Sequence, residues 1–182
     1  MELILIRHTA VDVPRGICYG QTDVDLKPTF EEEAALVNAQ LQSLLLKEKT
    51  AEALPIYSSP LSRCRRLAAF CGYREPRIEP RILEMNFGNW EMHVFDEISD
   101  EHLRTWFNNW IDETPTNGES FRTMIARVGD FIHDLKSSGH KRAVAFTHGG
   151  VIACARIHAG LTTPEKAFEN PANYGEIVRI HF

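Results

Sequence analysis

The sequence predicts an α/β fold with three α/β/α layers, in which helices cover both faces of a mostly parallel central sheet. Short apolar strands alternate along the 182-residue chain with segments of helical periodicity. Such alternation is typical of parallel sheets with crossover helices on either side. Polar residues that are unusual in such positions follow three of the strands. Because ligands in open α/β sheets bind beyond the carboxyl ends of the strands, we expect the functional site there.

The first half of the chain contains two expected strands and two expected helices. Glu2–Ile6 is apolar and rich in β-forming residues, and Phe30–Lys47 has helical periodicity. A short strand is expected at Pro55–Ser58. The next helix is expected over Pro60–Cys71, with Ser59 as its N-cap and a proline at its first position.

The second half repeats this alternation and ends in a strand. Glu119–Ser138 is expected to form a long amphipathic helix, because apolar residues recur on one face. Arg142–Phe146 reads as a buried strand and Val151–Ala159 as the helix after it. Glu176–Phe182 alternates between apolar and polar residues, so it predicts a final strand with one wetter face.

Length and composition limit the classes to which the protein can belong. We expect one domain over residues 1–182, because this length supports a single sizeable core. No apolar run approaches the roughly 20 residues that cross a bilayer, and the N-terminal apolar stretch is too short for a signal peptide. A cytoplasmic location without membrane attachment is therefore expected. The net charge of −5 disfavours a nucleic-acid-binding protein.

The four cysteines predict no disulfide framework. Cys18, Cys64, Cys71 and Cys154 form no Cys-x-x-Cys pair. If Cys64 and Cys71 share a helix, they lie roughly 10 Å apart, beyond the ~7 Å that a disulfide tolerates between Cα atoms. Buried or unreactive thiols in a reducing compartment are the expectation.

The first polar loop begins with Arg7 and His8 at the end of the N-terminal strand. A lone histidine at a strand end is usually a polar residue with satisfied hydrogen bonds. An arginine beside it is harder to explain without an anion, and guanidinium groups match phosphate oxygens bidentately. An adjacent permanent cation also favours the neutral, nucleophilic imidazole of His8.

Two further loops add cations and another histidine. Arg63, Arg65 and Arg66 fall in the first turns of a helix, where the dipole disfavours cations. Arg65 and Arg66 are expected on a solvated face, whereas Arg63 suits an anion site. His148 lies in a Thr-His-Gly-Gly segment, where Gly149 and its neighbour allow backbone N–H groups to approach an anion.

With these motifs the sequence resembles the histidine phosphatase superfamily, which shares the fold of cofactor-dependent phosphoglycerate mutase. The resemblance covers nearly the whole chain in the order and at the spacing of the family. It rests on the segments LIRHT, SSPLSRCRRLA, ILEMNFGNWE, NGESF and VAFTHGG. It implies a phosphoglycerate mutase-like fold and a phosphatase that needs neither metal nor cofactor.

The resemblance also implies residue roles. His8 matches the nucleophile that becomes phosphohistidine, and Arg7, Arg63 and His148 match the groups around the transferring phosphoryl. Glu84 matches the proton donor to the leaving oxygen, and it then serves as the base that activates water. A small phosphorylated molecule is the implied substrate, and inorganic phosphate is the implied product.

One segment narrows the expected substrate. Residues 16–26, GICYGQTDVDL, resemble the corresponding segment of the α-ribazole phosphatases, which act late in cobalamin biosynthesis. By this resemblance Tyr19, Gln21 and Thr22 border the substrate, although ordinary loop packing is the alternative for Tyr19. Thr9 replaces the glycine of the family, and its hydroxyl can bond phosphate. Gly149 is the fifth residue expected at the substrate.

An aromatic stripe between Glu91 and Thr114 has two interpretations. It can wall the site for a benzimidazole-like base, or it can be the buried face of an amphipathic helix, which we favour. Its aromatic and aliphatic members lie at helical spacing: Phe95, Ile98, Leu103, Trp106, Phe107 and Trp110. The acidic residues among them are expected on a solvated face: Glu91, Asp96, Glu97, Asp100 and Glu101.

Three rival functions remain open at this point. The nearest are a broad-specificity phosphatase of small molecules and a mutase that returns the phosphoryl group to its substrate. The short chain favours hydrolysis, because it leaves little room for the segments that enclose substrate in resembling mutases. A non-catalytic binder of phosphorylated ligands is the third rival. The presence of both His8 and Glu84 weighs against it, since a binder needs neither a nucleophile nor an acid.

Overall fold

The computed structural model describes residues 1–46 and 54–182 and places a five-stranded sheet between two pairs of helices. The strands are β1 (Glu2–Arg7), β2 (Ile56–Ser58), β3 (Arg77–Ile78), β4 (Arg142–Thr147) and β5 (Ile177–His181). Their order across the sheet is β3-β2-β4-β1-β5, and only β5 runs antiparallel to its neighbour. The expected mostly parallel sheet is confirmed.

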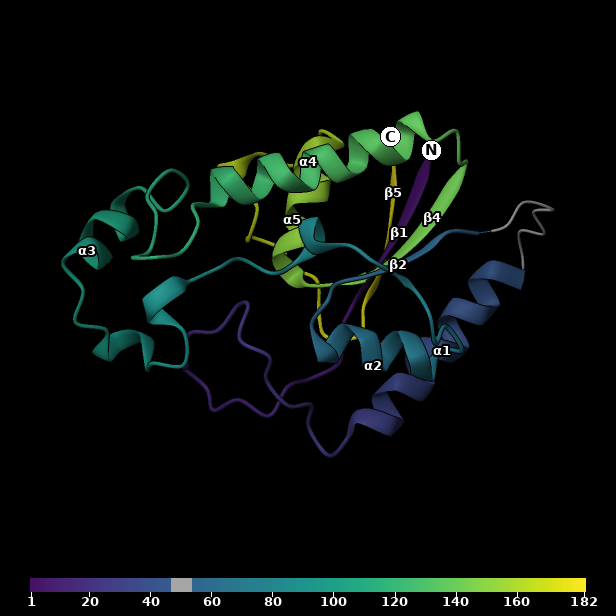
Figure 1. Ribbon diagram of the computed structural model, residues 1–182, viewed down its shortest axis with the longest axis horizontal. Coiled ribbons are helices and arrows are strands. Elements are labelled where there is room, and N and C mark those ends of the chain that lie inside the picture. The colour runs from purple at the N-terminus through teal and green to yellow at the C-terminus, as the bar shows by residue number, and fades with distance from the viewer. Residues whose placement is uncertain (47–53) are drawn as a thin grey trace.

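Helices cover both faces of this sheet. Four of them are α1 (Phe30–Leu46), α2 (Ser62–Phe70), α4 (Phe121–Ser137) and α5 (Gly149–His158). α4 and α5 lie on one side of the sheet, and α1 and α2 lie on the other (Figure 1). This arrangement confirms the expected three layers. Lys47, the last residue of the first expected helix, lies outside the described residues.

The alternation of side chains along the strands builds two cores. Leu3 and Leu5 of β1 join Ala143 of β4 in a core with α4 and α5. Ile4 and Ile6 point to the opposite face, where they pack with residues of α1 and α2. Neighbouring side chains of a strand point to opposite faces, so this buried pattern fixes which loops end at which side of the sheet.

The expected start of the second helix is wrong. Helix α2 begins at Ser62, and its N-cap is Leu61, which supplies no side-chain hydrogen bond. Pro60 therefore precedes the helix, and Ser59 is not its cap. The Ser59 hydroxyl lies 2.8 Å from Nε2 of His148. The Ser59 hydroxyl therefore contacts His148 from a distant segment, although local capping rules assign it to the start of the helix.

The segment between Glu91 and Thr114 also differs from expectation. It contains a short 3₁₀ turn at Phe95–Glu97 and helix α3 (Glu101–Asn108), neither of which has a buried residue. The favoured interpretation as the buried face of one amphipathic helix is wrong. α3 lies at the far end of the molecule from the sheet (Figure 1), and its Trp106 packs against the rings of Phe87, Trp90 and Phe95 instead.

Three smaller features complete the description. The two-residue strand β3 was not expected, and it extends the sheet at its β2 edge. All four cysteines are buried as free thiols. Among the residues that the structure describes, no helix is long and apolar enough to span a bilayer.

Candidate active site

The three polar loops meet at one edge of the sheet. β2, β4 and β1 are neighbours and run parallel, so their carboxyl ends lie together. His8 follows β1 and His148 follows β4, and their ring centroids are 5.2 Å apart in an edge-to-face arrangement. Arg63 comes from the first turn of α2, which follows β2. The fold thus brings together both histidines and both arginines of the expected site.

His8 is held as a neutral ring with one free nitrogen. Its Nδ1–H donates to the carbonyl of Thr9 at 2.8 Å. Because a carbonyl only accepts, Nδ1 carries the proton and Nε2 keeps its lone pair. Burial, followed by the positive charges of Arg63 and Arg7, lowers the pKa of His8 to about 3. Near neutral pH the ring is therefore a nucleophile rather than a cation.

His148 is fully buried behind His8. Its Nε2 lies 2.8 Å from the Ser59 hydroxyl and 3.5 Å from Sγ of Cys64. Burial lowers the pKa of His148 well below its ordinary value, and the charges of Arg63 and Arg7 act in the same direction. The two imidazoles therefore pack together without mutual repulsion.

Arg63 is a fully buried cation without a carboxylate partner among the described residues. Its Nη2 donates to the carbonyl of Gly20 at 2.5 Å, and its Nη1 donates to that of Thr22 at 2.9 Å. Its Nε has no hydrogen-bond partner within the described part of the chain. Burying an unpaired guanidinium is costly, so its charge and its remaining donor suit an anion. Arg65 and Arg66 are exposed, as expected.

Arg7 is arranged in a similar way beside His8. Its Nη1 donates to the carbonyl of Ala172 at 2.5 Å, and its Nε is buried without a partner in the described residues. The guanidinium lies 4.0 Å from the centre of the Tyr174 ring. The Tyr174 hydroxyl lies 2.8 Å from the hydroxyl of Tyr19, which joins two distant loops.

These side chains line a cavity of about 210 Å³ with two chemically different sides. Arg7 and Arg63, together with the neutral ring of His8, form what we call its cationic side. The remaining lining is mostly apolar and aromatic, with one carboxylate: Tyr19, Glu84, Met85, Phe87, Met124, Gly150 and Phe168. The cavity can bind a phosphoryl group at one side and an apolar group at the other.

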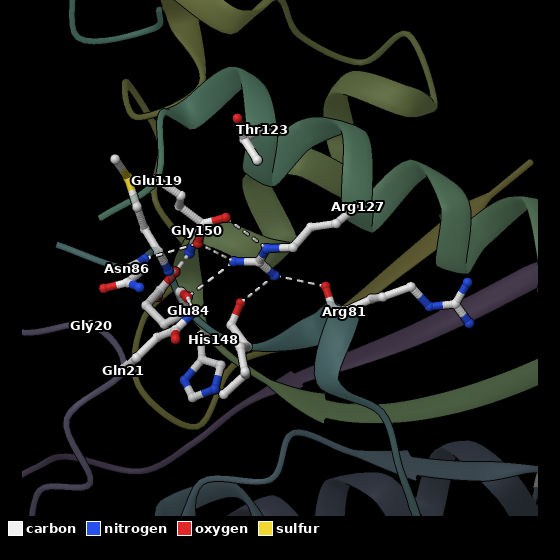
Figure 2. Close-up of polar contacts among 12 residues, drawn as sticks. Gly20, Gln21, Arg81, Glu84, Asn86, Glu119, Thr123, Arg127, His148 and Gly150 are labelled. Carbon is white, nitrogen blue, oxygen red and sulfur yellow. Dashed lines mark hydrogen bonds and ion pairs between the residues drawn. The ribbon is translucent and has the colours of Figure 1, made fainter. Parts of the chain in front are cut away.

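Glu84 reaches this cavity from an irregular segment. Its Oε2 accepts from the backbone N–H of Gly150 at 3.1 Å, and its Oε1 accepts from that of Met85 at 3.1 Å. A Cβ atom on Gly150 would lie 2.3 Å from Oε1 of Glu84. The glycine is therefore required for the carboxylate to approach the start of α5. Figure 2 shows the two residues and the dashed contact between segments far apart in sequence.

Only one of the five expected substrate-binding residues lines the cavity. Tyr19 does, whereas Thr9, Gln21, Thr22 and Gly149 do not. Thr9 is fully buried, and its hydroxyl has no partner among the described residues. Gly149 packs against Arg7, where a Cβ atom would lie 3.3 Å from Cζ.

Gln21 and Thr22 instead support the residues that do line the cavity. Nε2 of Gln21 donates to the carbonyl of Glu84 at 3.0 Å, and the carbonyl of Thr22 accepts from Arg63. Their backbone N–H groups donate to Glu91 at 2.9 and 2.5 Å. This segment therefore ties the cationic side of the cavity to Glu84.

The expectation of a solvated acidic face is wrong for Glu91 and Asp100. Glu91 also accepts from the backbone of Phe87 and from the Thr22 hydroxyl. Burial acts to raise the pKa of Glu91, but these hydrogen bonds lower it overall. Asp100 caps α3 and accepts from Trp90 at 2.6 Å. The other three acidic residues of the stripe are exposed: Asp96, Glu97 and Glu101.

The aromatic stripe does not wall the cavity either. Trp106 packs against Phe87 with ring centroids 6.4 Å apart, and Trp110 packs against Phe168 at 5.6 Å. Phe87 and Phe168 are the cavity residues, so the stripe supports the lining from behind. Sequence reasoning missed both phenylalanines and Tyr174, because none belongs to a periodic pattern.

A larger hollow beside α3 is a poor phosphate site. It measures about 780 Å³, and its lining includes Glu97, Asp100 and Glu101 but no arginine or lysine. Carboxylates repel a phosphate ester, and no cation in the lining offsets them. The smaller cavity at the sheet edge therefore remains the candidate active site.

Comparison with known proteins gives a consistent picture. A family model described as histidine phosphatase superfamily (branch 1) matches residues 3–182. A Salmonella typhimurium protein named adenosylcobalamin/alpha-ribazole phosphatase is 29% identical over 84% of this chain and 76% of its own length. A Hydrogenobacter thermophilus protein whose name refers to phosphoserine phosphatase is 29% identical over 88% of this chain and 80% of its own.

A solved structure supports the expected fold. The crystal structure of a phosphoglycerate mutase from Thermus thermophilus superposes with a TM-score of 0.74 at 28% identity, covering 100% of this chain and 94% of that one. The expected phosphoglycerate mutase-like fold is thereby confirmed. The resemblance that the five sequence segments carry is confirmed by the family match.

Proposed function

The chain belongs to the histidine phosphatase superfamily, and from this premise we propose that it hydrolyses α-ribazole 5′-phosphate through a phosphohistidine at His8. It is an enzyme, a phosphoric monoester hydrolase that acts on small phosphorylated molecules. One observation carries the proposal: His8, Arg7, Arg63 and Glu84 line one cavity of about 210 Å³. We call Arg7, His8, Arg63 and His148 the phosphoryl half of the site.

In the first step, the lone pair of His8 Nε2 attacks phosphorus and the bond to the ester oxygen breaks. Arg7 and Arg63 balance the charge spread over the phosphoryl oxygens, which is the main contribution of proteins to such transfers. The departing alkoxide takes its proton from the Glu84 carboxyl group. The products of this step are the free alcohol, phosphohistidine and the Glu84 carboxylate.

In the second step, water attacks the phosphorus of phosphohistidine and the bond to Nε2 breaks. The Glu84 carboxylate takes a proton from that water, which restores the carboxyl group. Inorganic phosphate leaves, and His8 returns to its neutral form. The hydrogen bond from Nδ1 to Thr9 keeps the ring in the tautomer required for the next cycle.

The apolar lining supports a substrate with a flat, apolar alcohol portion. Met85, Phe87, Met124 and Phe168 make up most of the apolar lining of the cavity. With Glu84, they form what we call the leaving-group half of the site. Aromatic and thioether groups favour a planar base such as the benzimidazole of α-ribazole. The name of the Salmonella relative points the same way.

Phosphoserine is the rival substrate that the relatives suggest. Its alcohol portion carries an ammonium and a carboxylate at neutral pH, and both lose hydration on entering the cavity. Apart from Arg7 and Arg63, which the phosphate group occupies, the described lining offers no charged partner for them beyond Glu84. Burying unpaired charge is costly, so we rank phosphoserine below α-ribazole 5′-phosphate.

Release of inorganic phosphate from a panel of esters tests the proposal. The panel contains α-ribazole 5′-phosphate, phosphoserine, 3-phosphoglycerate and p-nitrophenyl phosphate, without 2,3-bisphosphoglycerate, on which a mutase depends. We expect the highest kcat/KM for α-ribazole 5′-phosphate. His8→Ala is expected to lose at least about 10³-fold on every ester. Turnover by this variant at the native rate contradicts the mechanism, and a preference for phosphoserine contradicts the substrate.

A further inference from the structure

We propose that Arg127 is a positioning residue that, together with Glu119, holds Glu84 at the leaving oxygen. This inference rests on the proposed function, in which Glu84 donates the proton to that oxygen. Arg127 lies on α4 and does not line the cavity. It acts on Glu84 through the backbone.

The segment that carries Glu84 has no regular structure to hold it. Residues 83–87 lie between two 3₁₀ turns and belong to no strand or α-helix. Such a segment needs other partners for its backbone carbonyls. Here the partners are side chains from distant elements. Just before the segment, the carbonyl of Ile82 accepts from the Thr147 hydroxyl at 2.9 Å, and within it the carbonyl of Glu84 accepts from Gln21 at 3.0 Å.

Arg127 supplies most of the remaining donors. Its Nη1 donates to the carbonyls of Arg81 at 2.7 Å and Leu83 at 2.8 Å, and its Nη2 donates to that of Glu84 at 3.0 Å. A guanidinium has five N–H donors in a fixed plane. The other two bond Glu119 at 2.9 and 2.6 Å, so all five have acceptors. Figure 2 shows this planar group among its acceptors.

Glu119 closes the arrangement on the other side. Its Oε1 accepts from the backbone N–H of Asn86 at 2.9 Å, while its own backbone N–H donates to the carbonyl of Asn86 at 2.9 Å. The side chains of Arg127 and Glu119 are only 19% and 13% exposed, so water screens their ion pair weakly. Glu84 therefore lies between two anchored points, the carbonyls bound by Arg127 and the amide bound by Glu119.

The Arg127→Lys variant distinguishes the positioning of Glu84 from the effect of a positive charge at residue 127. A lysine ammonium has three donors on one atom and cannot match five acceptor oxygens spread around a plane, although it keeps the charge beside Glu119. Gln21 and Thr147 still hold two carbonyls, so we expect the segment to shift rather than unfold. A misplacement of about 1 Å at a reacting group can reduce the rate by about 10²-fold.

Dependence on the leaving group distinguishes this role from a structural one. An alkoxide needs a proton to depart, whereas p-nitrophenolate departs readily without one. kcat/KM reports the steps up to departure of the alcohol, so loss of the positioned acid lowers it for alkyl esters selectively. A general loss of structure lowers kcat/KM for both esters by the same factor.

The experiment measures kcat/KM for the best alkyl ester of the panel and for p-nitrophenyl phosphate. Arg127→Lys is expected to lose about 10-fold to 100-fold on the alkyl ester and less than about threefold on p-nitrophenyl phosphate. Arg122→Lys is the matched control on the same helix, because Arg122 forms an exposed ion pair with Asp112. It is expected to change neither value. Glu119→Gln is expected to show the pattern of Arg127→Lys with a smaller loss, and it decides the matter if Arg127→Lys does not fold.

Glu84→Gln in the same assay separates the two possible failures. If it loses activity on the alkyl ester selectively while Arg127→Lys and Glu119→Gln lose equally on both esters, or on neither, the positioning role is overturned and the proposed function stands. If Glu84→Gln itself shows no selectivity, its role as proton donor fails, and the inference fails with it.

Discussion

The two halves of the candidate active site are held in place by different kinds of structure. In the phosphoryl half, His8 and His148 directly follow neighbouring parallel strands, and Arg63 lies in the first turn of a helix. In the leaving-group half, Glu84 lies in an irregular segment that side chains from other elements hold by its carbonyls. The sheet therefore fixes the proposed nucleophile, while a polar network fixes the proposed proton donor.

This difference has a consequence for how the halves respond to mutation. Damage to the phosphoryl half is expected to affect all esters alike, because each passes through the same phosphoryl transfer. Damage to the leaving-group half is expected to depend on the alcohol, since only poor leaving groups need the proton. The ratio of activities on two esters thus reports which half a substitution disturbs.

Arg63→Ala is expected to have the largest effect. It removes a fully buried cation that also binds the carbonyls of Gly20 and Thr22. We expect kcat/KM to fall about 10³-fold, and by a similar factor for alkyl esters and for p-nitrophenyl phosphate. Arg65→Ala, at an exposed position of the same helix, is the control and should retain native activity. A loss confined to alkyl esters would place Arg63 in the other half.

Gly150→Ala is expected to damage the leaving-group half. The added Cβ lies 2.3 Å from Oε1 of Glu84, so the carboxylate has to move. We expect about a 10²-fold loss of kcat/KM on alkyl esters and a much smaller one on p-nitrophenyl phosphate. Gly149→Ala is the neighbouring comparison, because its Cβ meets Arg7 at 3.3 Å instead. Its loss should be smaller and equal on both esters, and the reverse pattern would contradict the division.

The acid stability of the protein should reflect the phosphoryl half. The pKa of His8 is about 3 in the folded state, against an ordinary value of 6.5. Between these values the unfolded chain binds more protons, so the free energy of unfolding rises with pH and falls on acidification. From pH 7 to about 5, His8 alone accounts for a decrease of about 2 kcal/mol. Denaturant unfolding at both pH values should show a smaller decrease for His8→Gln, and an equal decrease would contradict the burial of a neutral ring.

The tyrosine pair is expected to have the smallest effect. The hydroxyls of Tyr19 and Tyr174 lie 2.8 Å apart, in loops that flank Arg63 and Arg7. Tyr174→Phe removes only this hydrogen bond and keeps the ring over Arg7. We expect kcat/KM to fall by about twofold to tenfold, as a single hydrogen bond allows. Tyr19→Phe should fall equally and the double variant no further, whereas additive losses would show separate roles.

The residues of the phosphoryl half could be predicted from the sequence more directly than those of the leaving-group half. The places of Arg7, His8 and His148 follow from buried strands, whose carboxyl ends must meet at one edge. Glu84 came only from family resemblance, because nothing in its local pattern indicates a site. Arg127 and Glu119 lie on or beside a predictable helix, yet they bind backbone atoms 33 to 46 residues away in the chain. Local patterns carry no information about such pairings.

The expectations for Ser59 and Glu91 were wrong because tertiary contacts are not visible in the local sequence. Ser59 fits the rules for helix capping, but its hydroxyl lies against His148. Glu91 looks like a solvated charge, but it binds the backbone of Gln21 and Thr22. In both cases a tertiary hydrogen bond gives the side chain a role that the sequence pattern alone does not indicate.

The central claim is that the phosphoryl group passes through His8. The direct test mixes the enzyme with a phosphate ester, quenches within milliseconds in alkali, where phosphohistidine survives, and maps the phosphorylated residue by mass spectrometry. We predict a phosphoryl group on His8 that forms and decays at rates compatible with turnover, and none in the His8→Ala variant. A phosphoryl group on His148 instead, or steady release of phosphate with no phosphorylated enzyme at any time, would contradict this account.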